Sequence, residues 1–512
     1  MKRIFPCPAL LFSCLALLPL LLPLMIVTAA RGQVVRETPK DLTKEPMIIR
    51  LTVDAAPEPN PALRYTLVPT LAEQKPGNGA SFYYRALAQM MEIESRLSAK
   101  QQELFRENYD RWLTETSDPV VRKQAQEWAH PFRWVIPALK TAAYRETVDF
   151  DLRTRDARGM EFIEFYLPEV QNMRALARLL AIRICLAAAE GRPADAIEDL
   201  RLGYKMARDV GSSGTLVGGL VGLASEQLMN QTVLALISAP AAPNLYWAIA
   251  NLPQPVVDMR SGMEAEYDNA EQLFPFLKDA ESDGRTAAEW TRIFNAAVGE
   301  DLRLIRGAFG KTSEVAGDKT PSTPQQFLDQ AYPIAKRELI AAGYDRQRIE
   351  RMPAPQVVAI QTRRITRYAY DEIYKWLPLP YWQSDPQIEK SMEKLAREGI
   401  LASGTLTPRG ALPIAQALLS DVPASHRAAA RTQRDRAALQ TIEALRLHAA
   451  KTGAWPDSLD QLAVAPAPLN PVTGKSFPYE KRGNVAVLNA PIVGAIYGVR
   501  YEITLRKPPA TK

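Results

Sequence analysis

The sequence predicts a mainly α protein, with an irregular multi-helix body of helical hairpins and a small C-terminal α+β module. Three observations predict this class. Apolar residues recur at helical spacing from about residue 80 to about residue 450, and strand-like alternation is scarce there. Near residue 470 the pattern changes to short alternating segments separated by turn residues. A chain of 512 residues that is 47% hydrophobic and 23% charged can bury cores of this size.

Residues 1–29 are predicted to be a signal peptide or a membrane anchor. Lys2 and Arg3 precede a stretch without a charged residue, which ends in small residues at Ala29 and Ala30. The small residues suit cleavage, whereas the length of the apolar run approaches the roughly 20 residues that span a bilayer. We therefore expect an exported protein of the periplasm or cell envelope, either free or anchored to the inner membrane.

The remaining chain divides by composition into five parts. Residues 30–75 are polar and proline-bearing and are predicted to be a linker, in which "PMIIRLTV" can form one short strand. The other four are a helical domain (76–306), a loop rich in Gly, Ser, Thr and Pro (307–324), a helical segment (325–424) and the C-terminal module (425–512). Within the helical domain, "TVDFDLRT" at 147–154 is the best strand candidate.

A helical hairpin is predicted around Gly191, where glycine ends one helix and Pro193 begins the next. Its second half resembles a tetratricopeptide hairpin, and the residues that carry this resemblance are Gly191, Ala196, Ile197, Leu200 and Gly203. A shift of 34 residues finds no second copy, so a repeat array is not predicted.

The next helix is predicted to place Gly214, Gly218 and Gly222 on one face, where small residues permit close helix contact. Polar residues in the same helix, among them Glu226 and Asn230, argue against a membrane span.

Two short stretches look like phosphate-binding loops, and both fail the test. Such a loop needs G-x-x-x-x-G-K-[ST] between a strand and a helix. Before Gly474-Lys475-Ser476 the first glycine is replaced by Leu469, and before Gly310-Lys311-Thr312 it is replaced by Ile305. No nucleotide site is predicted, and the stretch "NPVTGKSFPY" is expected to be a turn that leads into a strand.

Other catalytic and metal-binding motifs are absent or incomplete. His130, His426 and His448 are isolated in the sequence, and no Cys/His cluster is available for zinc. The Ser391–Lys394 and Lys451–Gly453 segments imitate two elements of penicillin-binding enzymes, but the element between them is missing. Cys185 lies in an apolar helical pattern and is expected to be a buried, unreactive thiol. The carboxylates of Glu161, Glu164 and Glu169 are expected to lie on solvated helix faces. No catalytic, cofactor-binding or metal-binding residue is therefore assigned, and no cofactor is expected.

The C-terminal module is predicted to pack one helix on a three-stranded antiparallel sheet. Ala438, Ile442 and Leu445 line one face of a helix that Gly453 ends, and two turns then separate three short strands. Together with the G-x-W-P turn at Gly453–Pro456, this order resembles the globular part of type II secretion pseudopilins. The apolar segment of a pilin does not lead directly into this module, so pilus assembly is not predicted.

The whole layout resembles uncharacterised exported proteins of planctomycete-type bacteria, which implies export but no particular activity. We expect a helical interaction or scaffold protein of the cell envelope, and we favour this function over an enzymatic one. The alternative is an envelope hydrolase whose acid-lined site forms only in the fold. Expected partners are other envelope proteins, and the membrane if the N-terminal segment stays attached. Nucleic acid is not expected, because the net charge of +6 is spread among interspersed acids.

The turn interpretation of "NPVTGKSFPY" makes a testable prediction. Gly474→Val should cost about 1 kcal/mol or more, because a positive φ strains a branched residue, whereas Lys475→Ala should change stability by less than about 0.5 kcal/mol. We expect ATP and GTP to give no saturable thermal stabilisation of the wild type. Saturable stabilisation that Lys475→Ala abolishes would contradict this interpretation.

Overall fold

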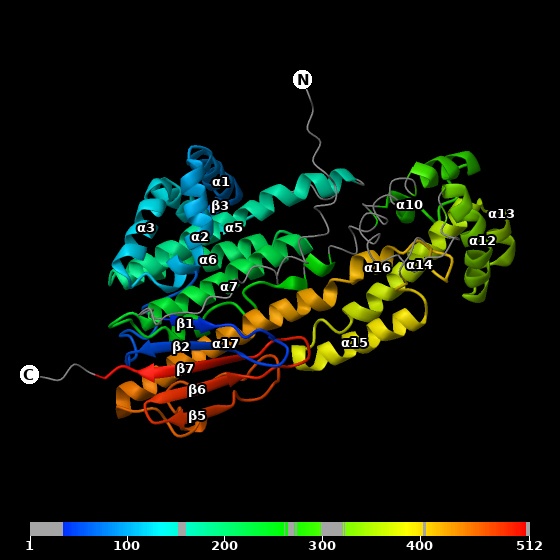
Figure 1. Ribbon diagram of the computed structural model, residues 1–512. Helices are drawn as coiled ribbons and strands as arrows, with labels where there is room; N and C mark the ends of the chain where they lie inside the picture. Colours follow the sequence, from blue (N-terminus) through cyan, green and yellow to red (C-terminus); the bar gives the residue numbers. More distant parts are fainter. Residues whose placement is uncertain are drawn as a thin grey trace, which may run out of the picture.

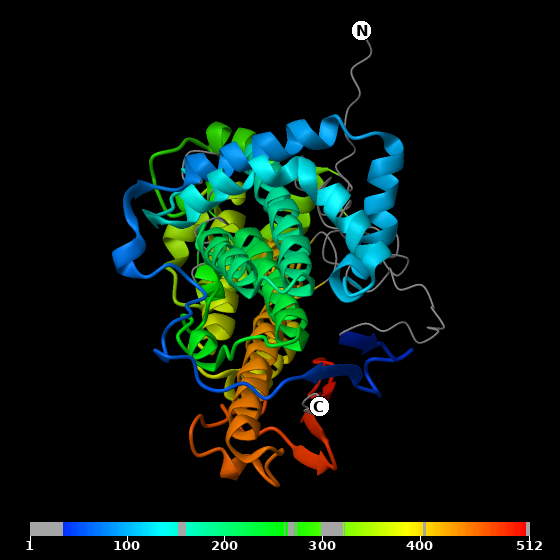
Figure 2. The same ribbon diagram turned by 90° about the vertical axis from the view of Figure 1, so that its left-hand side faces the viewer.

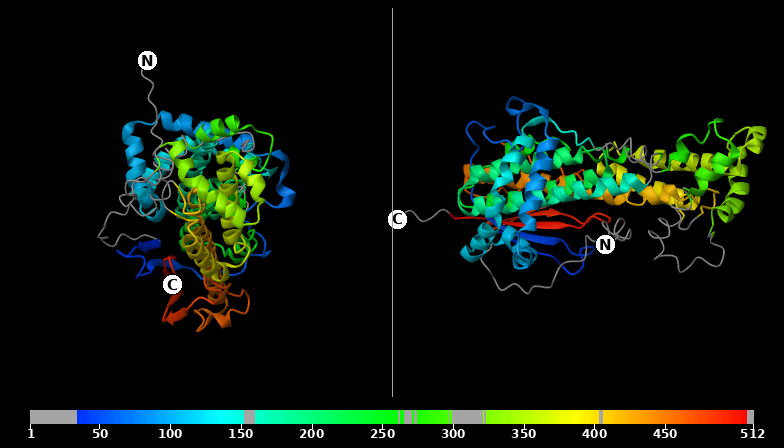
Figure 3. Two further views of the ribbon diagram at one scale, coloured as in Figure 1. Left: turned by 90° about the vertical axis from the view of Figure 1, so that its right-hand side faces the viewer. Right: turned by 90° about the horizontal axis from the view of Figure 1, so that it is seen from above.

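The computed structural model describes residues 34–151, 160–260, 262–264, 271, 274–296, 298, 321, 323–402 and 406–507. The predicted signal segment 1–29 and nearly all of the predicted loop 307–324 lie outside these ranges. The fold is mainly α with one small sheet, as predicted. Figures 1 and 3 show an elongated molecule, with the sheet near one end and a helical lobe at the other. Among the described residues, none of the helices combines the length and the apolar composition that crossing a bilayer requires.

Four long helices form the centre of the molecule. They are α5 (Met160–Ala189), α6 (Pro193–Gly211), α7 (Leu216–Ser238) and α17 (Val422–Thr452). Figure 2 looks along this bundle and shows α5, α6 and α7 above α17, with the strands of the sheet beside α17. The hairpin between α5 and α6 turns at Gly191 (φ +69°), as the sequence predicted.

Glycines let these helices approach closely. A Cβ at Gly222 on α7 would lie 2.6 Å from the Ala207 carbonyl of α6, and one at Gly203 on α6 would overlap the Met229 side chain of α7. Gly214 differs from the prediction, because it lies in the turn before α7 at φ +77° and not on the helix face. The helix begins one residue after Thr215, whose hydroxyl accepts the Gly218 N–H at 2.9 Å.

The N-terminal helices cover one side of the bundle (Figure 1). They are α1 (Ala80–Ser95), α2 (Ala99–Thr114), α3 (Pro119–Ala129) and α4 (Ile136–Ala143), with a short 3-10 turn, η3 (His130–Trp134), between the last two. Their core is aromatic, and Phe105 stacks on Trp128 with ring centroids 4.7 Å apart. A two-stranded parallel ribbon, β3 (Lys75–Asn78) with β4 (Arg145–Thr147), ties the start of this layer to its end.

The sheet differs from the predicted one in size and origin. It has five strands in the order β1-β2-β7-β6-β5, and β2 pairs with β7 in parallel, whereas three antiparallel strands were predicted. β5 (Tyr479–Arg482), β6 (Val485–Ala490) and β7 (Val499–Leu505) come from the C-terminal module, as predicted. β1 (Val34–Glu37) and β2 (Met47–Val53) come from the predicted linker. The linker prediction is wrong for this stretch, because β2 alternates buried Ile49, Leu51 and Val53 against the core.

The distal lobe has a hydrophobic core of its own. Its helices include α10 (Pro275–Lys278), α12 (Pro324–Ala341), α13 (Arg346–Arg351) and part of α14 (Ala354–Tyr374), and residues 287–296 are also helical. Buried residues on both sides of the predicted loop 307–324 share this core, among them Phe294 and Phe327, whose ring centroids lie 6.1 Å apart. The loop is therefore not a boundary between separately packed parts. Helices α14, α15 (Tyr381–Arg397) and α16 (Ile414–Leu419) connect the lobe to α17 (Figure 1). Other short helices include α8 (Tyr246–Ala250), η2 (Leu71–Glu73) and η4 (Leu459–Gln461).

The stretch "NPVTGKSFPY" is a turn that leads to β5, as predicted. Gly474 has φ +67°, and a Cβ there would also lie 2.6 Å from the indole ring of Trp382 on α15. Lys475 is exposed. The turn therefore serves as a packing surface for Trp382, and the cost of Gly474→Val has two physical causes, backbone strain and steric overlap.

Two buried ion pairs involve α17, one within the helix and one that joins it to α7. Arg446 pairs with Glu443 at 2.7 Å, and both side chains are fully buried. Arg436 on α17 pairs with Glu226 on α7 at 3.0 Å. Burial raises the pKa of Glu226 to about 7, although the Arg436 charge and a backbone hydrogen bond from Val257 oppose the shift. Glu226, which argued against a membrane span in the sequence, thus has a buried partner within the protein.

The Arg446–Glu443 pair makes a stability prediction. Arg446→Met leaves the Glu443 carboxylate buried without its cation and should lower the free energy of unfolding by about 3 to 5 kcal/mol. The matched control is Arg96→Met, which breaks an exposed pair with Glu92 and should cost less than about 1 kcal/mol. Urea denaturation of the purified full chain measures both values. Equal costs for the two variants would contradict the central role given to Arg446.

Candidate functional site

A pocket lies between the segment after β2 and the outer face of α6. Its volume is about 380 Å³, within the roughly 300 to 1,000 Å³ typical of small-molecule sites. It is lined by Leu63, Arg64, Tyr65, Thr66, Thr70, Glu73, Ala194, Ile197, Glu198 and Arg201. Four of these residues are charged, in two pairs of opposite sign. The pocket is therefore a polar site with a balanced local charge.

One wall of the pocket is held in place by a capping box. The backbone N–H and the hydroxyl of Thr70 both donate to Glu73 Oε2 at 2.8 Å. The chain then enters β3, where the Lys75 N–H donates to the Tyr144 carbonyl at 2.8 Å. These bonds fix the Glu73 carboxylate at the pocket and bring Tyr144 beside it.

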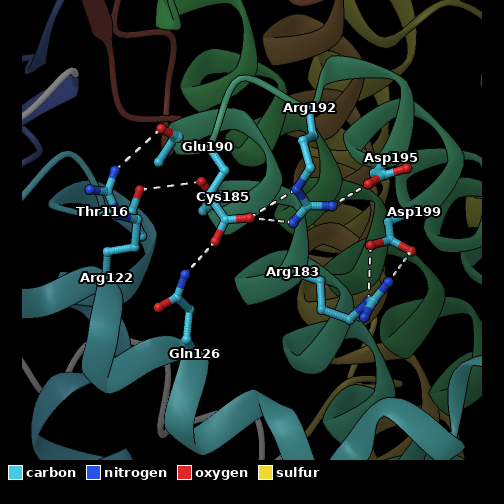
Figure 4. A network of polar contacts seen from close by, with 10 residues as sticks. Thr116, Arg122, Gln126, Arg183, Cys185, Glu190, Arg192, Asp195 and Asp199 are labelled. Atoms are coloured by element: carbon cyan, nitrogen blue, oxygen red, sulfur yellow. Dashed lines mark hydrogen bonds and ion pairs between the residues drawn. The ribbon is translucent and has the colours of Figure 1, made fainter. Parts of the chain in front are cut away.

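The other wall is the first two turns of α6. Ala194, Ile197, Glu198 and Arg201 lie at i, i+3, i+4 and i+7, so they share one helix face. Figure 4 shows the polar network that positions the start of this helix. Gln126 of α3 donates to Glu190 at 2.6 Å, and Arg192 lies between Glu190 and Asp195.

The same network continues on the inner side of α6. Arg183 of α5 donates to both oxygens of Asp199, at 3.0 and 3.3 Å. Burial raises the pKa of Asp199 to about 6, and the Arg183 charge opposes this rise. Asp199 thus fixes the rotation of α6 from inside, while its neighbour Glu198 faces the pocket.

Arg201 is the centre of the pocket. Its guanidinium donates to Glu73 at 2.5 Å and to Glu198 at 3.2 Å. Glu198 also accepts from Lys140 at 2.7 Å and from the Tyr144 hydroxyl at 3.0 Å. The guanidinium carbon lies 5.4 Å from the centre of the Tyr144 ring, which is a cation–π contact. Five side chains from three chain segments therefore hold one another in a single geometry.

This geometry keeps both carboxylates of the pocket ionised. Burial would raise the pKa of Glu73, but hydrogen bonds from Arg201 and Thr70 outweigh it and lower the pKa to about 2. For Glu198, burial is likewise outweighed by hydrogen bonds from Lys140 and Tyr144, and its pKa is lowered. Burial raises the pKa of Tyr144 to about 12, so its hydroxyl stays protonated. The two acids can accept hydrogen bonds, but neither is poised to donate a proton at neutral pH.

A second polar cluster joins α15 to α17. Ser384 Oγ lies 2.7 Å from His426 Nε2, and the Tyr381 ring packs on the imidazole at 5.0 Å between centroids. Burial lowers the pKa of His426, while the nearby Asp385 charge raises it. Ser384 has no exposed surface, so its hydroxyl cannot reach a substrate in this conformation. The contact is a buried hydrogen bond between two helices.

Ile197, singled out in the predicted hairpin, lines the pocket, whereas His130, Cys185, Ser391 and Lys394 do not. His130 is part of η3, with its Nδ1 atom 3.1 Å from Arg133. Cys185 is buried, as predicted, and burial raises the pKa of its thiol to about 12. Ser391 accepts a hydrogen bond from Trp376, and Lys394 pairs with Glu372. Glu161, Glu164 and Glu169 fall in the part of α5 whose side chains are not described.

The sequence analysis missed the pocket residues, although two signals pointed to them. The segment Thr70-Leu71-Ala72-Glu73 is a capping-box pattern within the predicted linker. Glu198 and Arg201 lie at i, i+3 on the exposed side of a predicted helix, where an intrahelical pair is the ordinary interpretation. Neither signal reveals that Glu73 meets Arg201 across 128 residues of sequence.

Among the described residues, no group of three or more His, Cys, Asp or Glu side chains is placed to hold a metal ion. Comparison of the whole chain with protein-family models, with curated proteins and with solved structures found no match.

The pocket makes a prediction about ionisation. Replacing Arg201 with Met removes the main hydrogen-bond partner of Glu73 and should move the pKa of Glu73 from about 2 toward its ordinary value of 4.5. Because the pKa of Glu73 is lowered in the folded state, the ionised Glu73 carboxylate stabilises the fold above pH 4.5. This stabilisation is lost as the pH falls toward 2. Carboxyl-selective NMR titration measures the midpoint. The control variant Arg96→Met should leave the Glu73 midpoint unchanged, and an unchanged midpoint in Arg201→Met would refute the assignment.

Proposed function

We propose that this protein is an exported helical interaction or scaffold protein of the cell envelope. The observation that carries the proposal is an exposed apolar surface where the α14–α15 corner meets the C-terminal module. Leu379 and Trp382, three residues apart in the chain, are each 40% exposed. Large apolar side chains in one exposed area are typical of protein interaction sites.

The apolar surface is rigid. Pro378 and Pro380 flank Leu379, and Pro380 has extended backbone angles of φ −53° and ψ 145°. The Trp382 ring lies against Gly474, so its position depends on the turn at 470–475. Beneath it, Tyr381 packs with Val472 and Ile496 of the C-terminal module. A surface that is ordered before binding loses little conformational entropy when a partner covers it.

The competing hypothesis, an envelope hydrolase, has less support. Glycoside hydrolysis needs one carboxylic acid with a raised pKa beside a carboxylate, whereas both Glu73 and Glu198 have lowered values. The Ser384–His426 contact favours a nucleophilic mechanism, because a hydroxyl within 2.7 Å of an imidazole can be activated. The complete burial of Ser384 weighs against it.

Export and the envelope location rest on the sequence of residues 1–29. The proposed partner is another envelope protein, with the membrane as a second partner if the N-terminal segment remains attached. The proposal includes no cofactor, nucleotide or nucleic acid.

The proposal predicts site-specific crosslinking. A photoreactive amino acid at position 379 should give one discrete adduct with an envelope protein in intact cells, and Trp382→Ser should reduce its yield several-fold. Position 120 is the matched control, because Val120 is also an exposed apolar residue but lies on α3, in the N-terminal layer. Equal adducts from both positions, or none from position 379, would argue against an interaction surface. A cytosolic location on fractionation would argue against the envelope.

A further inference from the structure

We infer that the pocket around Arg201 binds a neutral, polyhydroxylated ligand of the saccharide class. The inference goes beyond the proposed interaction function, since the pocket lies on α6 and the apolar surface lies at α15. It rests on the size of the pocket, on the donors and acceptors that remain available there, and on the apolar side chains between them.

The charges of the pocket disfavour ionic ligands. The terminal N–H groups of Arg201 are engaged by Glu73 and Glu198, so an incoming anion would have to displace a carboxylate and lie beside two acids. A cation would meet Arg64, Arg201 and Lys140 near the same two acids. A neutral ligand avoids both repulsions.

The remaining polar atoms suit hydroxyl groups. The hydrogen bonds to Glu73 among the described residues all fall on Oε2, so Oε1 can accept from a ligand. Arg201 Nε also lacks a hydrogen-bond partner within the described part of the chain, but it has almost no exposed surface, so a ligand does not reach it in this conformation. The Thr66 hydroxyl at the pocket wall can both donate and accept. A hydroxyl group is the ligand group that both donates and accepts, and a ring with several hydroxyls can satisfy these atoms together.

The apolar part of the lining suits the face of a sugar ring. Leu63, Tyr65 and Ile197 line the same pocket as the polar atoms. The guanidinium carbon of Arg64 lies 5.6 Å from the centre of the Tyr65 ring, which is a cation–π contact between two lining residues. Because Leu63 is 61% exposed, the mouth is open, and a chain of more than one sugar could extend past it. A fully apolar ligand would leave four charged side chains desolvated and is disfavoured.

The test uses the purified full chain and two variants, one that fills the pocket and one that removes a charged acceptor from it. Ala194 is exposed in the first turn of α6 and lines the pocket, so Ala194→Trp should block the pocket without removing a polar contact. The matched control is Ala99→Trp, which adds the same side chain at an exposed alanine in the first turn of α2. Glu73→Gln removes the charged acceptor but keeps the shape of the side chain. Its control is Glu92→Gln, at an exposed surface pair.

Binding is measured by isothermal titration and by ligand-observed NMR with glucose, N-acetylglucosamine and their β-1,4-linked disaccharides. We expect saturable binding of at least one of these sugars, weakened about tenfold or more by Ala194→Trp and by Glu73→Gln, and unchanged by both controls. Inorganic phosphate and ethylamine serve as ionic probes and should not bind. Binding of an ionic probe with no sugar bound, absence of saturable sugar binding, or sugar binding that survives both pocket variants would each overturn the inference. None of these results would affect crosslinking from position 379.

Discussion

The structure depends on one buried guanidinium. Arg446 of α17 donates to Glu443 on its own helix, to the Asp54 carbonyl just after β2, and to the Ala242 carbonyl after α7. Glu443 in turn accepts the Leu245 N–H at 2.9 Å. A buried charge is tolerated only when its hydrogen bonds are complete, so these segments must meet at one point. This requirement joins the N-terminal strands, the central bundle and the C-terminal helix into a single unit.

The sheet follows from that junction. With the chain after β2 tied to α17, β2 lies beside β7 over their full length, from the Met47–Val499 pair to the Val53–Leu505 pair. The strands of the C-terminal module thereby gain a parallel neighbour, and β1 takes the edge position. The shared core of the sheet, α7 and α17 explains why the C-terminal module is not an independent unit.

The two surfaces proposed to bind ligands are consequences of the same packing. The pocket forms because the chain that leaves β2 must cross α6 before it reaches β3, which places Glu73 against Arg201. The apolar surface forms because the turn at Gly474 packs on α15, which leaves Trp382 partly exposed beside Leu379. In both sites, one wall is formed by residues that are close together in the sequence. The other wall comes from a segment that is distant in the sequence.

The sequence by itself determined the local structure. Periodicity, glycine and proline predicted the helical body, the hairpin turn at Gly191 and the turn at Gly474, because these features depend on neighbouring residues along the chain. The tertiary structure decided the rest. Residues 34–53 look like a linker because the partner of β2 is the distant strand β7, and Glu73 looks like a simple cap because its partner Arg201 lies 128 residues away. Pairing across such distances depends on which surfaces meet in three dimensions, and one sequence carries no direct record of that meeting.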